Sequence, residues 1–130
     1  MKSVILSASD PGGGNSLLPI VGGLSGDLKL LFVLGGASRE LFKKAGIEFI
    51  DGDALNESEL RDLVHKFKPD LFIAGSSFGP TIDKRIFEIL KGKVKSIYIL
   101  DFWSNYWQRF SADKVKDFKY LPYFILNPFQ

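Results

Sequence analysis

Short apolar runs alternate with longer amphipathic segments along the whole chain. The runs predict buried strands at residues 3–8, 28–34, 47–50, 71–74, 96–100 and 123–126, because short apolar stretches bounded by turn residues are typical of strands covered on both faces. Between these strands, apolar residues recur at helical spacing from Asn15 or Ser16 to about Leu24, and over residues 38–45, 56–67 and 81–90. The pattern therefore predicts strands and helices in alternation.

This alternation indicates the fold class. Strands that alternate with helices through short connections form right-handed β-α-β units, which build a parallel sheet with helices on both faces. We therefore expect a three-layer, Rossmann-like α/β domain with a doubly wound parallel sheet of about six strands in the order 3-2-1-4-5-6. Residues 1–130 would form this single domain, since 130 residues is an ordinary length for one domain.

Local signals mark three of the helix ends. Asn56 followed by Glu59 is a capping-box pattern, which predicts that a helix starts there, and Pro69 predicts where this helix stops. Gly46 is expected to end the preceding helix in a left-handed conformation, which glycine adopts without steric cost.

Composition removes several classes of function. The chain carries 17 basic and 15 acidic residues without a long run of like charge, so we expect neither a nucleic-acid surface nor an anionic-membrane surface. It has no cysteine and one histidine, which excludes disulfides, thiol catalysis and thiolate or multi-histidine metal sites. No segment has the pattern of a targeting signal or a membrane span, so a soluble, cytoplasmic protein without a metal or cofactor is expected.

The loops that follow the predicted strands are the candidate site. Open α/β sheets bind ligands beyond the carboxyl ends of their strands. The loops at these ends are rich in glycine, small hydroxyls and carboxylates, and they comprise residues 10–15, 35–38, 51–53, 75–79 and 101–105. This asymmetry between the two edges of the sheet favours a binding site at the carboxyl edge.

The first of these loops combines glycines with a helix start. Gly12, Gly13, Gly14 and Asn15 precede the first predicted helix, where backbone amides can approach an anion. The alternative is a tight turn with nothing bound. A dinucleotide fingerprint is not supported, because Leu17 stands where the third glycine belongs and no acidic residue ends the second strand. The chain also lacks a phosphate-binding loop of the nucleotidase type and the paired acids of a phosphoacceptor domain.

Asp10 is the most plausible general base, because it follows the first strand at the expected edge. The alternative is a carboxylate that only caps the loop through the amides of residues 12–14. Ser76 and Ser77 could bind a polyol or a phosphate, and their alternative is to cap the helix that follows. Asp51 and Asp53 are close enough in sequence to ligate a divalent ion, although a polar turn is the simpler account.

The stretch from residue 101 to residue 110 is the least generic part of the chain. It holds both tryptophans, and its polar members Asp101, Asn105 and Arg109 stand beside aromatic residues such as Trp103. Aromatic platforms next to polar groups are typical of stacking against a sugar or a nucleobase. The alternative is an aromatic lid that packs on the end of the sheet or on another chain.

Several of these motifs together resemble one known family. The stretch Ser-Asp-Pro-Gly-Gly-Gly-Asn at residues 9–15, Gly-Gly-Ala at 35–37, Lys-Pro-Asp at 68–70 and Asp-Phe-Trp-Ser-Asn-Tyr at 101–106 are similar to motifs of the amino-terminal domain of GT-B glycosyltransferases. Such enzymes transfer a sugar from a nucleotide-sugar across a cleft between two Rossmann-like domains, and their first domain chiefly holds the acceptor.

The resemblance implies roles for individual residues. Asp10 matches the position of the catalytic base. Gly12, Gly13 and Gly14 would line the cleft near the donor phosphates, whereas Ser76, Ser77 and residues 101–105 would face a sugar or lipid-linked acceptor. The donor-binding domain is not in the sequence, so we expect a fragment that is inactive without that domain or a partner chain.

Two other functions remain open at this stage. One is a stand-alone Rossmann-like or flavodoxin-like module that binds a phosphorylated small molecule or nucleotide. The other is an interaction protein that forms a homo-oligomer through the apolar carboxyl-terminal stretch at residues 120–126.

Overall fold

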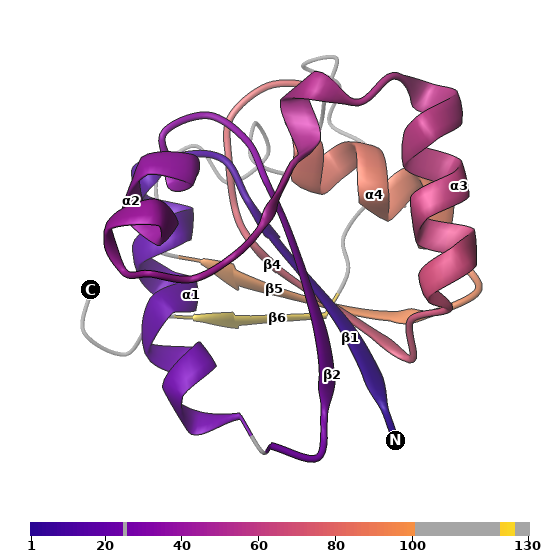
Figure 1. Ribbon diagram of the computed structural model, residues 1–130. Coiled ribbons are helices and arrows are strands. Elements are labelled where there is room, and N and C mark those ends of the chain that lie inside the picture. Colours follow the sequence, from indigo (N-terminus) through magenta and orange to yellow (C-terminus); the bar gives the residue numbers. More distant parts are fainter. Residues whose placement is uncertain (25, 101–122, 127–130) are drawn as a thin grey trace.

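The computed structural model describes residues 1–24, 26–100 and 123–126, the last four through their backbone. Its strands form one parallel sheet with the order β3-β2-β1-β4-β5-β6 (Figure 1). The strands are β1 (Ser3–Ala8), β2 (Lys29–Leu34), β3 (Ile50–Asp51), β4 (Leu71–Gly75), β5 (Lys95–Leu100) and β6 (Tyr123–Leu126). The expected Rossmann-like α/β class and its strand order are confirmed.

Helices connect the strands and cover both faces of the sheet, as Figure 1 shows. They are α1 (Pro11–Gly23), α2 (Ser38–Lys44), the short 3-10 helix η1 (Gly52–Ala54), α3 (Glu57–Phe67) and α4 (Ile82–Leu90). In the described part of the chain, no helix is both long and apolar enough to cross a membrane.

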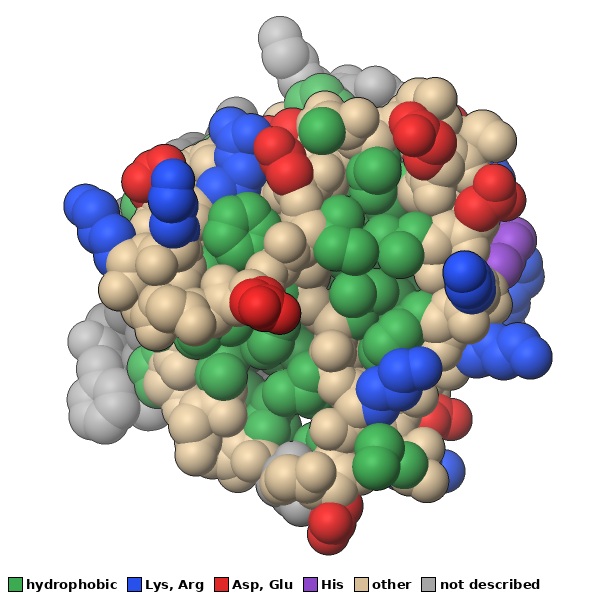
Figure 2. All heavy atoms as spheres, viewed as in Figure 1, with side chains coloured by type: hydrophobic (Ala, Val, Ile, Leu, Met, Phe, Trp, Pro, Cys, Tyr) green, Lys and Arg blue, Asp and Glu red, His purple; other side chains and the backbone are tan. Residues whose placement is uncertain are grey.

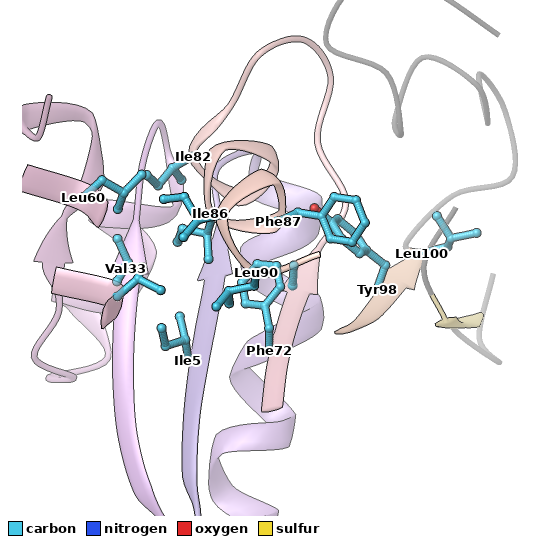
Figure 3. Close-up of a cluster of buried hydrophobic side chains, with 13 residues drawn as sticks. Ile5, Val33, Leu60, Phe72, Ile82, Ile86, Phe87, Leu90, Tyr98 and Leu100 are labelled. Carbon is cyan, nitrogen blue, oxygen red and sulfur yellow. The ribbon is translucent and has the colours of Figure 1, made fainter. Parts of the chain in front are cut away.

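The core has two clusters, one on each face of the sheet. One lies between the sheet and the helices α3 and α4, and Figure 3 shows Tyr98 of β5 beside Phe87 of α4 there. The other lies between the sheet and α1 and α2, with Leu17 and Phe42 as its buried helical members. Alternate residues of β1 face the two clusters, which explains why this central strand is apolar almost throughout.

Two predicted boundaries are wrong. Helix α1 begins at Pro11 rather than at Asn15 or Ser16, because a proline fits the first position of a helix and the glycines continue its first turn. Strand β3 is shorter than predicted and pairs only at Ile50 and Asp51. Ile47 and Phe49 precede it and pack half-buried against the cluster under α1 and α2. Their apolar character therefore reflects packing rather than strand pairing.

The short β3 leaves much of β2 as an outer edge. Only Val33 and Leu34 of β2 pair with β3, whereas all of β2 pairs with β1 on its other side. Figure 2 shows hydrophobic side chains on this side of the molecule, and acidic and basic side chains close together at the top, where β1 and β2 end.

The capping box predicted at Asn56 is confirmed. The Asn56 side chain accepts a hydrogen bond from the Glu59 amide at 2.8 Å, and the Glu59 carboxylate accepts one from the Asn56 amide at 3.0 Å. Gly46 has a φ of 73°, as its predicted left-handed position requires. The two hydrogen bonds of the capping box satisfy backbone amides that have no hydrogen-bond partner within the helix.

Asn56→Ala is expected to lower the free energy of unfolding by about 1 kcal/mol, because it removes the acceptor of the capping box. Urea denaturation measures the change. Ser58→Ala, at an exposed position in the same turn, should stay within about 0.5 kcal/mol of the wild type. Equal stabilities for the two variants would contradict this account of the helix start.

Candidate functional site

The carboxyl ends of β1 and β4 meet at Asp10. The Asp10 amide donates a hydrogen bond to Ser77 Oγ at 3.3 Å, and the Phe78 amide donates one to Asp10 Oδ2 at 2.9 Å. Asp10 and Phe78 are 68 positions apart in the sequence, so the fold alone joins them. We call Asp10, the first turn of α1 and residues 76–81 the strand-end site.

Asp10 stands at the N-cap position of α1, yet its side chain makes no capping hydrogen bond there. The alternative in which this carboxylate binds the amides of residues 12–14 is therefore wrong. The carboxylate is half-buried and points instead to the loop after β4. Within the described residues it accepts no hydrogen bond besides the one from Phe78.

The glycines of the first turn have a packing role. A Cβ on Gly13 would lie 3.0 Å from the Ser76 carbonyl oxygen, and a Cβ on Gly75 would lie 2.4 Å from the Gly13 carbonyl oxygen. A Cβ on Gly14 would lie 2.5 Å from Ser38 Oγ. Helix α1 therefore packs directly on the backbone of β4 and on the start of α2, where only glycine fits.

The same turn retains the donors of a helix start. In the first turn of a helix, the amides have no carbonyl partner within the helix, and the helix dipole favours an anion beside them. Gly12 and Gly13 contribute these amides, whereas Pro11 has none. Asn15 lies exposed one turn further along, and Gly12 is half-buried.

Ser76 and Ser77 are both fully buried behind Asp10. Ser77 Oγ accepts the hydrogen bond from the Asp10 amide, and the Ser76 amide donates one to the Ile99 carbonyl at 3.2 Å. The N-cap of α4 is Thr81, so the alternative in which these serines cap that helix is wrong. Ser77 instead supports Asp10.

Four predicted site residues lie outside the part of the chain that the structure describes. These are Asp101, Trp103, Asn105 and Arg109. Their roles stay predictions.

Ion pairs of Arg39 connect the loops that follow β2 and β3. Arg39 forms ion pairs with Asp51 at 3.0 Å and with Asp53 at 3.9 Å, and Asp53 accepts a hydrogen bond from the Gly36 amide at 2.8 Å. The sequence spacing does not join Arg39 to these acids, because they stand in different loops and meet only in the fold. In the described residues, no group of three or more His, Asp or Glu side chains is placed to hold a metal ion.

The sequence analysis did not single out a second charged pair, Asp83 and Lys84, which the structure buries. Asp83 and Lys84 of α4 are 0% and 7% exposed, although charged side chains are rarely buried unless paired. Asp83 accepts hydrogen bonds from the hydroxyls of Thr81 and Tyr98, and burial raises the pKa of both Asp83 and Tyr98. Lys84 Nζ donates to the Ser77 carbonyl. The helical pattern alone could have flagged this pair, because both residues stand among the apolar positions of α4.

Comparisons with known proteins give matches only at the level of structure. No protein-family model matches the chain, and no curated protein matches its sequence. A co-structure of S. aureus MnaA with UDP superposes with a TM-score of 0.56 and 16% identity, over 76% of this chain and 29% of that one. A UDP-N-acetylglucosamine 2-epimerase gives 0.53 and 12%, over 76% and 33%. A putative UDP-N-acetylglucosamine 2-epimerase from Listeria monocytogenes gives 0.53 and 10%, over 76% and 30%.

These matches identify the fold. The chain spans about a third of the length of the structures that it matches. Its strand order and its paired helical layers are those of a Rossmann-like domain of the GT-B-like kind, as the sequence motifs indicated. The resemblance is therefore confirmed for the fold.

Proposed function

We propose that this chain is a cytoplasmic, nucleotide-sugar-binding domain of a glycosyltransferase-like protein, with Asp10 as its general base. The observation that carries the proposal is the position of the Asp10 carboxylate. It lies at the carboxyl end of the central strand, held by the Phe78 amide and next to the open first turn of α1.

In this proposal the base and the anion site are separate parts of the strand-end site. If the Asp10 carboxylate accepted hydrogen bonds from the amides of the first turn, it would exclude a phosphate from them. It accepts a hydrogen bond from the loop after β4 instead. The amide of the half-buried Gly12 then stays available to the phosphates of a donor, with the buried Gly13 behind it. A positive helix end beside a separately held carboxylate suits a substrate that has an anionic part and an uncharged hydroxyl.

The reaction proposed for this base is sugar transfer. Asp10 would take the proton of an acceptor hydroxyl as its oxygen forms a bond to the anomeric carbon of the donor. The bond from that carbon to the phosphate oxygen breaks, and the nucleoside diphosphate leaves with the electron pair. Residues 101, 103, 105 and 109 belong to the acceptor side in this proposal, with a sugar or a lipid-linked alcohol as the acceptor. Ser76 and Ser77 are fully buried and would lie behind Asp10 without contacting the acceptor.

The proposed reaction needs a second domain or a partner chain to complete the active site. The superposed part of this chain covers only 29–33% of the matched structures, which supports a site shared with further protein. The chain alone would then bind the donor weakly and would not turn it over.

The matched structures also favour a second candidate function. Two of them are described as UDP-N-acetylglucosamine 2-epimerases, one of these as putative. An epimerase reaction would change the configuration of a sugar carbon without an acceptor. Product analysis with and without an acceptor, in the presence of the completing chain, distinguishes the two reactions, because only transfer needs the acceptor.

Titration of the chain with UDP tests the binding. We expect a Kd on the order of 1 mM, or about −4 kcal/mol, because only part of the ligand is contacted. Two-dimensional NMR should show the largest shifts at the amides of Gly12, Gly13 and Phe78. Absence of these shifts would contradict the proposal, and binding of a flavin nucleotide in place of UDP would favour the stand-alone module.

Asp10→Asn separates the base from the binding site. We expect it to leave the UDP affinity within about threefold of the wild type, since the carboxylate does not occupy the helix amides. Asp62→Asn, at an exposed position on α3, makes the same chemical change away from the site. Loss of UDP binding in Asp10→Asn but not in Asp62→Asn would show that Asp10 binds the nucleotide instead of serving as a base.

A further inference from the structure

A buried lysine stands directly behind the strand-end site, and the proposed reaction does not use it. Lys84 lies in the first turn of α4 and is 7% exposed. Its Nζ donates a hydrogen bond to the Ser77 carbonyl and another, at 3.4 Å, to Thr81 Oγ1. Burying an ammonium group is costly, so the contacts that it makes are expected to matter.

The carbonyl that Lys84 holds belongs to the peptide group whose other end holds Asp10. The Ser77 carbonyl and the Phe78 amide are the two polar ends of one planar, trans peptide group. Lys84 Nζ binds the oxygen of this group, and the Asp10 carboxylate accepts a hydrogen bond from its nitrogen at 2.9 Å. The Lys84 ammonium and the Asp10 carboxylate thus form hydrogen bonds at opposite ends of one peptide dipole.

This arrangement orients the peptide and polarises it. In a planar trans peptide the C=O and N–H bonds point in opposite directions, so fixing the oxygen also fixes the direction of the N–H bond. Hydrogen bonds to ionised groups are stronger than neutral ones, and linked hydrogen bonds polarise one another. Ser77, which supplies the carbonyl of this peptide group, also accepts a hydrogen bond from the Asp10 amide through its Oγ at 3.3 Å.

We propose that Lys84 is a positioning residue, which holds the Asp10 carboxylate in place through the peptide group between Ser77 and Phe78. Its importance for the reaction rests on the proposed role of Asp10, but the coupling itself does not. Around Lys84, Thr81 accepts from its ammonium and donates to Asp83, and Asp83 accepts from Tyr98. These contacts keep the lysine on the buried side of the loop.

The amide signal of Phe78 reports the coupling. An amide proton that donates to a carboxylate has a characteristic downfield shift, which Asp10→Asn should reduce. We expect Lys84→Met to move this signal in the same direction, and to speed hydrogen exchange at Phe78 by roughly tenfold, because a charge-assisted hydrogen bond is lost. Lys84→Arg, which keeps a cationic donor, should restore part of the effect.

Matched controls separate positioning from general loosening. Lys91→Met removes an exposed ammonium just beyond the same helix, where Lys91 pairs with Glu88, and should leave Phe78 unchanged. The double variant of Asp10→Asn with Lys84→Met should differ from the sum of the single changes, as expected of coupled groups. An unchanged Phe78 signal in Lys84→Met, or equal acceleration of exchange at all amides, would overturn the proposal.

A reciprocal measurement covers the case in which Lys84→Met does not fold. Coupling between two sites is mutual, so Asp10→Asn should alter the ammonium signal of Lys84. An unchanged Lys84 signal in that variant overturns the proposal. UDP titration of the wild type is scored separately, so a failure to bind UDP would remove the proposed function and leave the Phe78 result standing.

Discussion

Gly75→Val is expected to prevent stable folding, and Gly75→Ala is expected to cost about 3 kcal/mol or more. A Cβ at position 75 would lie 2.4 Å from the carbonyl oxygen of Gly13 and 2.5 Å from its Cα. Overpacking a core usually costs about 1–3 kcal/mol, and occasionally more. Here both partners are backbone, so either α1 or β4 must move. Chemical denaturation of the alanine variant measures the loss.

Gly22→Ala is the matched control for this substitution. Gly22 lies in α1, the helix that packs on Gly75, and a Cβ there would have no atom within 4 Å. Because alanine favours a helix over glycine, this variant should gain about 0.5–1 kcal/mol. A Gly75→Ala protein as stable as the wild type would show that α1 does not rest on β4 as closely as described.

The glycines also show how far the sequence could predict the site. Three adjacent glycines, which the sequence placed before a helix and the structure places in its first turn, correctly marked the carboxyl edge of the first strand. The sequence did not predict their packing role, in which Gly13 allows α1 to contact β4 and Gly14 allows it to contact α2. Local sequence cannot reveal a partner that lies more than sixty residues away. The fold class followed from periodicity, which is a local property that the sequence does contain.

The environment of Asp10 shows the same limit. Its place after the first strand was enough to nominate it as a base, since strand ends meet at one edge of such a sheet. The groups that hold it, Ser77 and Phe78, belong to another loop, and the lysine behind them belongs to α4. Sequence spacing alone could place none of these contacts, because they depend on which strands are neighbours.

The second large effect is expected at Asp83, through the pH dependence of stability. Asp83 is fully buried, and burial raises its pKa above the ordinary value of 3.8, against the opposing charge of Lys84. In the unfolded chain, the same carboxyl ionises near its ordinary pKa. Between these two pKa values the folded protein holds a proton that the unfolded chain has released, so the stability falls as the pH rises through this window.

Asp83→Asn removes this titration and is expected to remove the fall in stability that Asp83 causes as the pH rises. At about pH 3.5 the variant should be less stable by about 1–3 kcal/mol, because Asp83 uses one oxygen for Thr81 and the other for Tyr98, whereas asparagine has one acceptor oxygen. As the pH rises to about 7.5, the wild type loses stability and the variant does not, so the deficit should shrink.

Urea denaturation of both proteins across this pH range measures the difference, and Asp62→Asn on the exposed face of α3 serves as the control. Tyr98 does not confuse the result, because burial raises its pKa well above 10 and keeps its hydroxyl neutral throughout. A deficit that stays constant with pH would mean that Asp83 titrates alike in the folded and unfolded chain. A deficit that grows with pH would mean that the ammonium of Lys84 outweighs burial, and Asp83 would then be an ionised partner within the network that holds the loop beside Asp10.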